Sequence, residues 1–343
     1  MKNKKFVRPT LLAVAAAVSL MASSGMSHAG AIISNGTITL GVNDQGHLNI
    51  GGGAPSSGTG TTFVGLRYNL TGAEATAPGC LCEGWGAGIV GLGTSGFANV
   101  AIDGVQNLSL LSFSSTASTA TSVVSIGGAL EITHFYHPTA KTDNLYQVDV
   151  SIKNLTGTAL AAGDVRYRRV MDWDIEPTAF REYVTIGGVP GALGIANGSN
   201  LRRVGDNGFA SANPLNDSSL TISCPANANF TDCGPSDHGA LFDFEFAALA
   251  ADATTSFTTY YGAAGNTADA DAARLAVGAG LYSYGESALD PGTGTPNTFI
   301  FGFGATNGIF VPPPIGEVPE PFSLALFGIG FAGLGFARRR KMI

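Results

Sequence analysis

The chain has 343 residues, with 18 basic and 25 acidic side chains and 48 glycines. Eight of the basic residues lie at the two ends, so residues 30–317 hold ten basic against twenty-four acidic side chains, a formal charge of −14 that excludes nucleic-acid binding as a leading function. Glycine is about twice as frequent as usual, but a hydrophobic content of 45% excludes a collagen-like or disordered chain.

Residues 1–29 have the pattern of a secretory signal peptide. Four basic residues occur among the first eight, an apolar stretch runs from Leu11 to Met21, and the small-residue site Ser27-His28-Ala29 precedes Gly30. A retained membrane anchor is the alternative, but the alanine-rich stretch is short and weakly hydrophobic for crossing ~30 Å of hydrocarbon. We therefore predict export and removal of residues 1–29.

Residues 30–311 show mostly a two-residue apolar period. Tyr146, Val148, Val150 and Ile152 alternate with polar residues, which predicts a strand with one buried face. Similar strands are expected at 32–42, 63–68, 97–102, 108–113, 121–126, 130–136, 165–172, 181–186, 242–246, 255–262 and 298–304. Many short strands between glycine-rich turns, including an exposed loop at 51–62, predict a mainly β fold: one large antiparallel β-sandwich domain.

One short helix is expected after Thr267, which we predict as its N-cap. Asp269 and Asp271 suit the first turn, where the helix dipole is positive. The apolar residues at helical spacing are Ala272, Leu275, Ala276 and Ala279. A calcium loop is the alternative, but it would need more oxygen ligands and a glycine at its sixth position.

Four cysteines in an exported chain predict disulfides. They are Cys80, Cys82, Cys224 and Cys233, and three pairings are possible. Pairing Cys80 with Cys82 and Cys224 with Cys233 closes small loops, while pairing between these two groups remains open. Zinc is the alternative, but the spacings do not match zinc fingers and no histidine lies close in sequence. We expect neither a metal nor a cofactor.

The densest polar cluster runs from Arg166 to Tyr183 and includes Glu182. Asp172, Asp174 and Glu176 fall on one face of a continued strand and Trp173 on the other, a combination typical of carbohydrate sites. The alternative is a mutual ion-pair network with the arginines of the same segment, since the charges nearly balance. Those arginines are Arg166, Arg168, Arg169 and Arg181.

Two further groups are weaker candidates. His134 and His137, near Glu131, point to opposite faces of a strand, so they cannot share one metal ion unless the chain bends. Residues 79–86, which include Cys80, Cys82, Glu83 and Trp85, form either a rigid binding loop or a disulfide-closed turn.

The C-terminus has three parts in a fixed order. A short linker at 312–317 leads to Val318-Pro319-Glu320-Pro321, an apolar run at 322–337 follows, and Arg338, Arg339, Arg340 and Lys341 almost end the chain. Sixteen helical residues cover only ~24 Å, so they span a bilayer marginally. The basic cluster favours the cytoplasmic side, and the prolines keep the segment before the helix extended.

This arrangement resembles the PEP-CTERM sorting signal, also labelled the ice-binding protein C-terminal domain, over about residues 317–341. The resemblance implies processing near Pro-Glu-Pro by exosortase, a membrane-embedded cysteine transpeptidase. It also implies a Gram-negative bacterium that makes extracellular polysaccharide, and many such proteins are linked to the biofilm matrix. Nothing in the sequence supports ice binding.

We predict a non-enzymatic, exported protein, anchored transiently in the inner membrane and then delivered to the cell surface or extracellular matrix. Its partners would be exosortase and the export machinery, with extracellular polysaccharide as a candidate contact. One alternative is a carbohydrate-active enzyme of the mutarotase or lyase kind, using Asp172, Asp174, Glu176 or His134. Another is a calcium-stabilised adhesin, suggested by the acidic charge.

Overall fold

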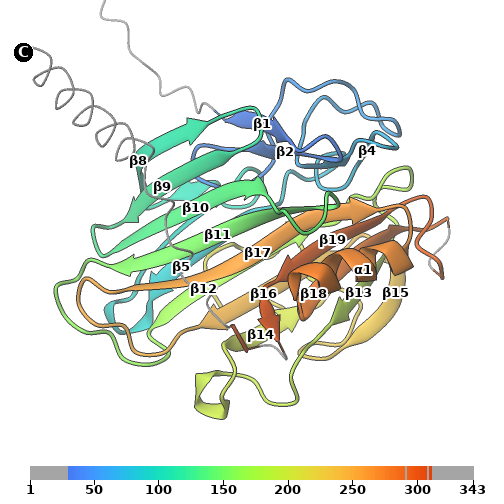
Figure 1. Cartoon of the computed structure of the whole chain (residues 1–343). Helices are drawn as coiled ribbons and strands as arrows, with labels where there is room; N and C mark the ends of the chain where they lie inside the picture. Colours follow the sequence, from blue (N-terminus) through green and yellow to red (C-terminus); the bar gives the residue numbers. More distant parts are fainter. Residues whose placement is uncertain (1–29, 290–291, 307–308, 311–343) are drawn as a thin grey trace, which may run out of the picture.

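The computed structural model describes residues 30–289, 292–306 and 309–310, and this part of the chain is mainly β (Figure 1). The predicted signal peptide (1–29), linker (312–317), sorting motif (318–321 and 338–341) and transmembrane helix (322–337) lie outside the described residues. No helix in the described part of the chain combines the length and the apolar character needed to cross a membrane.

Antiparallel pairing builds one large, one medium and two small sheets. The nine-stranded sheet runs, in spatial order, β15 (Phe230–Ser236), β13 (Glu182–Gly187), β18 (Leu281–Ser287), β19 (Thr298–Phe303), β17 (Thr254–Ala264), β11 (Leu145–Asn154), β10 (Leu130–Pro138), β9 (Ala120–Ile126) and β8 (Leu108–Ser115). The six-stranded sheet runs β14 (Leu201–Gly205), β16 (Gly239–Glu245), β12 (Val165–Asp172), β5 (Gly84–Ile89), β6 (Thr94–Asn99) and β7 (Val105–Gln106). The small sheets are β1 (Ala31–Ser34), β2 (Ile38–Val42), β3 (Leu66–Tyr68) and β4 (Ala73–Glu74), and β20 (Ala305–Thr306) with β21 (Ile309–Phe310).

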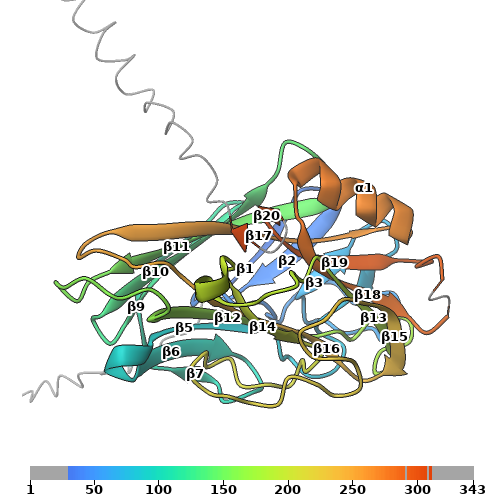
Figure 2. The ribbon, with the colours of Figure 1, turned by 90° about the horizontal axis from the view of Figure 1, so that it is seen from below.

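The two larger sheets face one another and enclose the main core, which confirms the predicted antiparallel sandwich. Seen from below, β5, β6, β12, β14 and β16 form one layer under β10, β11 and β17 (Figure 2). The ring of Phe242 on β16 lies 5.6 Å from that of Phe301 and 4.8 Å from that of Phe303, both on β19. Burying each such ring contributes about 1.5–3 kcal/mol, so these contacts hold the sheets together.

The two-residue apolar period locates strands well where one face is exposed to solvent, but it misses strands that are rich in glycine. β11 alternates buried and half-buried side chains as predicted, whereas β5, with the sequence GWGAGI, is buried throughout and shows no alternation. A Cβ on Gly86 would lie 2.2 Å from the Ala212 carbonyl oxygen, so glycine is needed there for close packing of the backbone.

The helix α1 (Thr267–Val277) lies on the outer face of the nine-stranded sheet (Figure 2), and its details correct two predictions. Its N-cap is Asn266, whose side-chain oxygen accepts from the Asp269 amide at 2.9 Å, and Thr267 is the first helical residue. The buried residues are Ala270, Ala273 and Val277, whereas Leu275 is 65% exposed. Alanines occur on both faces, so the apolar spacing alone does not identify the face that packs.

A buried ion pair joins the sheet interior to the segment 43–49. The Arg169 guanidinium on β12 donates to Glu83 at 2.6 Å, and both side chains are fully buried. The other Glu83 oxygen accepts from the Leu48 amide at 2.6 Å, and Tyr261 on β17 donates to Glu83 at 2.8 Å. Glu83 therefore connects three parts of the chain that are distant in sequence.

Candidate functional site

The candidate carbohydrate site predicted at the end of β12, with Asp172, Asp174 and Glu176 on one face and Trp173 on the other, forms only in part. Trp173 is fully buried and its indole N–H donates to the Ser283 hydroxyl on β18 at 3.1 Å, so its ring is not available to stack on a sugar. Asp172 and Asp174 are also buried, and one carboxylate oxygen of each lies within 4.8 Å of the other and of Asp237. These two acids come together as alternation predicts.

Glu176 belongs to a different arrangement. Its carboxylate accepts hydrogen bonds from the Gly58 amide at 3.2 Å, the Thr59 amide at 2.6 Å and the Ser56 hydroxyl at 2.5 Å. Burial would raise the pKa of Glu176, but these donors and the Glu74 amide lower it below its usual value. Glu176 therefore holds the loop at 51–62 against the body and does not join Asp172 and Asp174.

Two other acids complete the group, which we call the carboxylate cluster: Asp172, Asp174, Glu182 and Asp237. Glu182 is the first residue of β13 and is fully buried, whereas Asp237 is exposed and directly precedes His238. The sequence placed Glu182 in the same polar segment but gave it no part in a site, because it lies on the other large sheet; Asp237 was missed, since it lies in a loop more than sixty residues from Asp174. No local pattern links positions brought together only by sheet packing.

The cluster contains more negative charge than its surroundings can neutralise. Burial, followed by repulsion from neighbouring carboxylates, raises the pKa of Asp172 well above its usual value, that of Asp174 to about 7 and that of Glu182 to about 9. The amides of Trp173, Gly79 and Arg181 act in the opposite direction, but the carboxylate oxygens receive no hydrogen bond of normal geometry.

The neighbouring arginines have partners elsewhere, so the predicted ion-pair network does not form. Arg168 donates to Asp243 on β16 at 2.5 and 2.8 Å, and Arg169 pairs with Glu83. The side chain of Arg166 lies near Arg202 and Glu245, and the side chain of Arg181 is exposed. The charges balance in the sequence, but Arg168 and Arg169, which are both fully buried, each pair with an acid from another segment.

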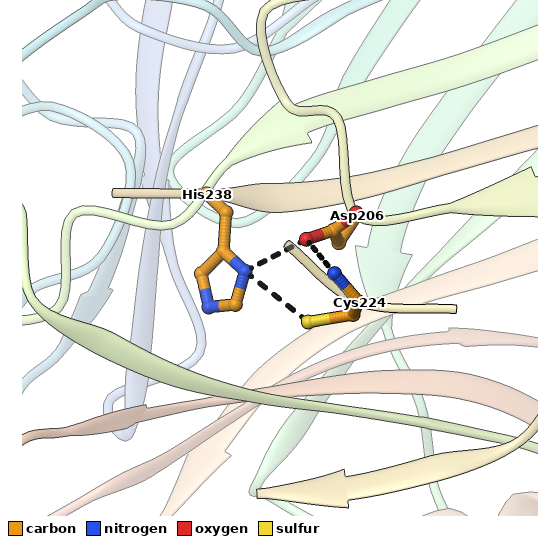
Figure 3. A group of neighbouring side chains, drawn as sticks. All are labelled: Asp206, Cys224 and His238. Carbon is orange, nitrogen blue, oxygen red and sulfur yellow. Dashed lines mark hydrogen bonds and ion pairs between the residues drawn. The ribbon is translucent and has the colours of Figure 1, made fainter. Parts of the chain in front are cut away.

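A second polar group, Asp206, Cys224 and His238, is satisfied internally (Figure 3). Asp206 accepts from the amides of Ile222, Ser223 and Cys224 at 2.9–3.0 Å. His238 faces Asp206 at 3.0 Å through Nδ1 and the Glu182 carbonyl at 3.1 Å through Nε2. Both ring nitrogens of His238 thus lie within hydrogen-bond distance of an oxygen. This group joins the 222–224 segment to the strand end that carries Glu182.

The cysteines pair within each group, as Cys80–Cys82 and Cys224–Cys233, with Cα–Cα distances of 5.1 and 6.1 Å. The pairing confirms the expected disulfides and answers the question of connectivity. A disulfide sulfur is not a thiolate, so Cys224 cannot complete a zinc site with Asp206 and His238. In the loop at 79–86, Glu83 and Trp85 point into the core and are fully buried.

His134 and His137 lie on opposite faces of β10, as their spacing predicts. His134 is buried between the sheets and its Nε2 lies 3.0 Å from the Tyr167 hydroxyl; burial and Arg169 lower its pKa well below the usual value. His137 is on the outer face, where its Nε2 lies 3.1 Å from Asp149 on β11. The two histidines cannot hold one metal ion.

Residues 317–341 match the family model for the PEP-CTERM protein-sorting motif. The match supports export through the membrane to the cell surface and exosortase-dependent sorting, with exosortase as the processing partner. The curated proteins contain no match to this chain.

Proposed function

We propose that the body is a non-enzymatic module of the cell surface or extracellular matrix, anchored in the inner membrane only until its sorting tail is processed, and that it contacts extracellular polysaccharide. The sorting-motif match at 317–341 is the observation that carries this proposal. The acidic body, the two disulfides and the signal-peptide pattern at 1–29 support an extracellular role.

The sorting part is tested by removing the basic end. Deleting residues 338–343 takes away the cytoplasmic charge that orients the tail, so we expect an unprocessed precursor that stays with the membrane. Intact-mass measurement and cell fractionation of the deletion variant and the wild type provide the readout. A variant with Arg202→Ala and Arg203→Ala removes basic residues from the body and serves as the control. Normal processing and surface delivery of the deletion variant would refute the sorting proposal.

The outer face of the nine-stranded sheet is the surface that we assign to polysaccharide. Phe135 on β10 is 37% exposed and its ring stacks on that of His137, with centroids 4.7 Å apart. In register beside Phe135 lie Asp149 and Thr258, and the Thr258 hydroxyl donates to Asp149 at 3.1 Å. An exposed ring beside carboxylate, imidazole and hydroxyl groups can stack on the C–H face of a sugar and bond to its hydroxyls.

A glycan array with the purified protein tests this assignment. Phe135→Ala removes the stacking surface, and a loss of about 0.5–1.5 kcal/mol corresponds to weakening of about 2- to 12-fold. Phe63→Ala is the matched control, since Phe63 is 41% exposed in the loop before β3. Equal weakening by both substitutions would refute the assigned face. Absence of binding to every glycan would refute the polysaccharide contact while leaving the sorting proposal untouched.

A carbohydrate-active enzyme remains the second candidate because of one observation. Asp172 and Asp174 have oxygens within 4.8 Å of each other, and a pKa of about 7 for Asp174 would suit a general acid. Burial of both acids and of Trp173 leaves them poorly placed to reach a sugar. Release of reducing ends from polysaccharide, abolished by Asp174→Asn, would replace the non-enzymatic proposal with this one.

A further inference from the structure

The carboxylate cluster has buried groups without partners. Asp172, Asp174 and Glu182 are each at most 1% exposed, and none of their six carboxylate oxygens accepts a hydrogen bond of normal geometry. Buried carboxylates in stable folds are normally paired with a cation or with several donors, because losing hydration is costly. The Asp206 group a few residues away satisfies this rule, so the deficit belongs to the cluster and not to the whole region.

We propose that the carboxylate cluster binds a divalent cation, and specifically Ca²⁺. Calcium takes six to eight oxygen ligands at about 2.3–2.6 Å, so two oxygens on opposite sides of one ion are about 5 Å apart. Oxygens from Asp172, Asp174 and Asp237 all lie within 4.8 Å of one another, which lets them share one ion. Carboxylates are hard ligands that suit calcium better than zinc.

Glu182 and Asp237 have different parts in this site. Glu182 lies on β13 of the nine-stranded sheet and Asp172 on β12 of the six-stranded sheet, so an ion held by Asp172, Asp174 and Asp237 would reduce the repulsion between acids of the two layers. Asp237 is the exposed member, and it marks the side from which the ion and its remaining water ligands enter. The side chain of Asp174 is closely covered by Gly79, where an added Cβ would lie 2.6 Å from Oδ1.

Charged groups around the cluster favour a cation. The groups that act on Asp172, Asp174 and Glu182 are other acids, including Glu74 on β4, and His238 acts on Asp237 alone. A cation placed among these acids would therefore reduce their mutual repulsion.

The test uses the full-length chain, purified in mild detergent, stripped with EDTA and then freed of EDTA. For a Kd of about 0.1 mM, 10 mM CaCl₂ should raise the Tm by about 5 °C. Terbium, which occupies calcium sites, should show luminescence excited through Trp173, and Ca²⁺ should displace it. We expect the variant Asp172→Asn/Asp174→Asn to lose both responses, and Asp143→Asn, an exposed acid outside the cluster, to keep both.

In the absence of metal, the double variant should differ from the wild type in the opposite direction, with a higher Tm. Asparagine avoids the cost of burying two carboxyl groups in either their charged or their protonated form, so Asp172→Asn/Asp174→Asn should melt at a higher temperature than the wild type in EDTA and show no further increase with calcium. This gain identifies a folded variant. An unchanged wild-type Tm with CaCl₂, or an increase retained in the double variant, would overturn the proposal. An equal increase with MgCl₂ would overturn the assignment to calcium.

Discussion

The buried pair between Arg169 and Glu83 allows a quantitative test of what holds the sandwich together. Substituting Glu83 by Gln keeps the size of the side chain and removes its charge. Arg169 would then be a buried cation without a counter-ion, and breaking such a pair from one side costs about 3–5 kcal/mol. A glutamine that still accepts from Arg169 and Tyr261 turns its amide N–H₂ toward the Leu48 N–H, which costs about 1–3 kcal/mol more.

Because these two costs overlap, we expect a total loss of about 5 kcal/mol, comparable to the whole stability of many domains. Urea unfolding at pH 7, followed by tryptophan fluorescence, measures the loss for Glu83→Gln. Glu131→Gln is the matched control, because Glu131 is half-buried on β10, outside the ion pair, and should change the stability by less than about 0.5 kcal/mol.

A double-mutant cycle with Arg169→Met isolates the pair itself. The coupling energy between Glu83 and Arg169 should exceed about 2 kcal/mol, since the double variant buries no lone charge. A loss below about 1 kcal/mol for Glu83→Gln, or a coupling energy near zero, would show that water or another group compensates the charge. That result would refute the role assigned to this ion pair in joining the segment 43–49 to the sheets.

Three further predictions concern single contacts. Burial alone would lower the pKa of His137, but Asp149 and the Pro138 carbonyl raise it overall. The pair between His137 and Asp149 therefore stabilises the fold at acidic pH, and its contribution is lost as the pH rises through the raised pKa. In an NMR titration Asp149→Asn should lower the midpoint of His137, and an unchanged midpoint would contradict the pairing. Replacing Cys224 and Cys233 by Ala opens a nine-residue separation and should cost about 2–3 kcal/mol in urea unfolding, while no loss would mean that Asp206 and His238 suffice to hold the segment. Glu176→Gln should cost about 1–3 kcal/mol and speed proteolysis within 56–60, whereas unchanged cleavage would argue that the loop is held by other contacts.

The predicted helix shows where local reasoning loses accuracy. The position of α1 follows from its capping and spacing, which depend on neighbouring residues. Its buried face was predicted wrongly, because alanine is compatible with both faces and the choice depends on the sheet below. Leu275 points to solvent while Ala270 and Ala273 permit close approach to β17 and β19.

The candidate site also separates what local sequence predicts from what sheet packing decides. Asp172 and Asp174 could be placed on one face from alternation alone, since the period of a strand is local. Glu182 belonged to the same polar segment, but its proximity to these acids, and that of Asp237, could not be predicted, because it depends on how one sheet packs on another. The arginines of β12 also found their partners, Asp243 and Glu83, through sheet register and long-range packing.

The sequence by itself determined the mainly β class of the body, the disulfide-forming cysteines and the sorting tail at 317–341, because periodicity, composition and short linear motifs are properties of neighbouring residues. Only the tertiary structure decided which charges neutralise one another and which four acids are left together. That outcome depends on the packing of two sheets whose strands are far apart along the chain, and the energy of a buried charge depends on what packing places beside it.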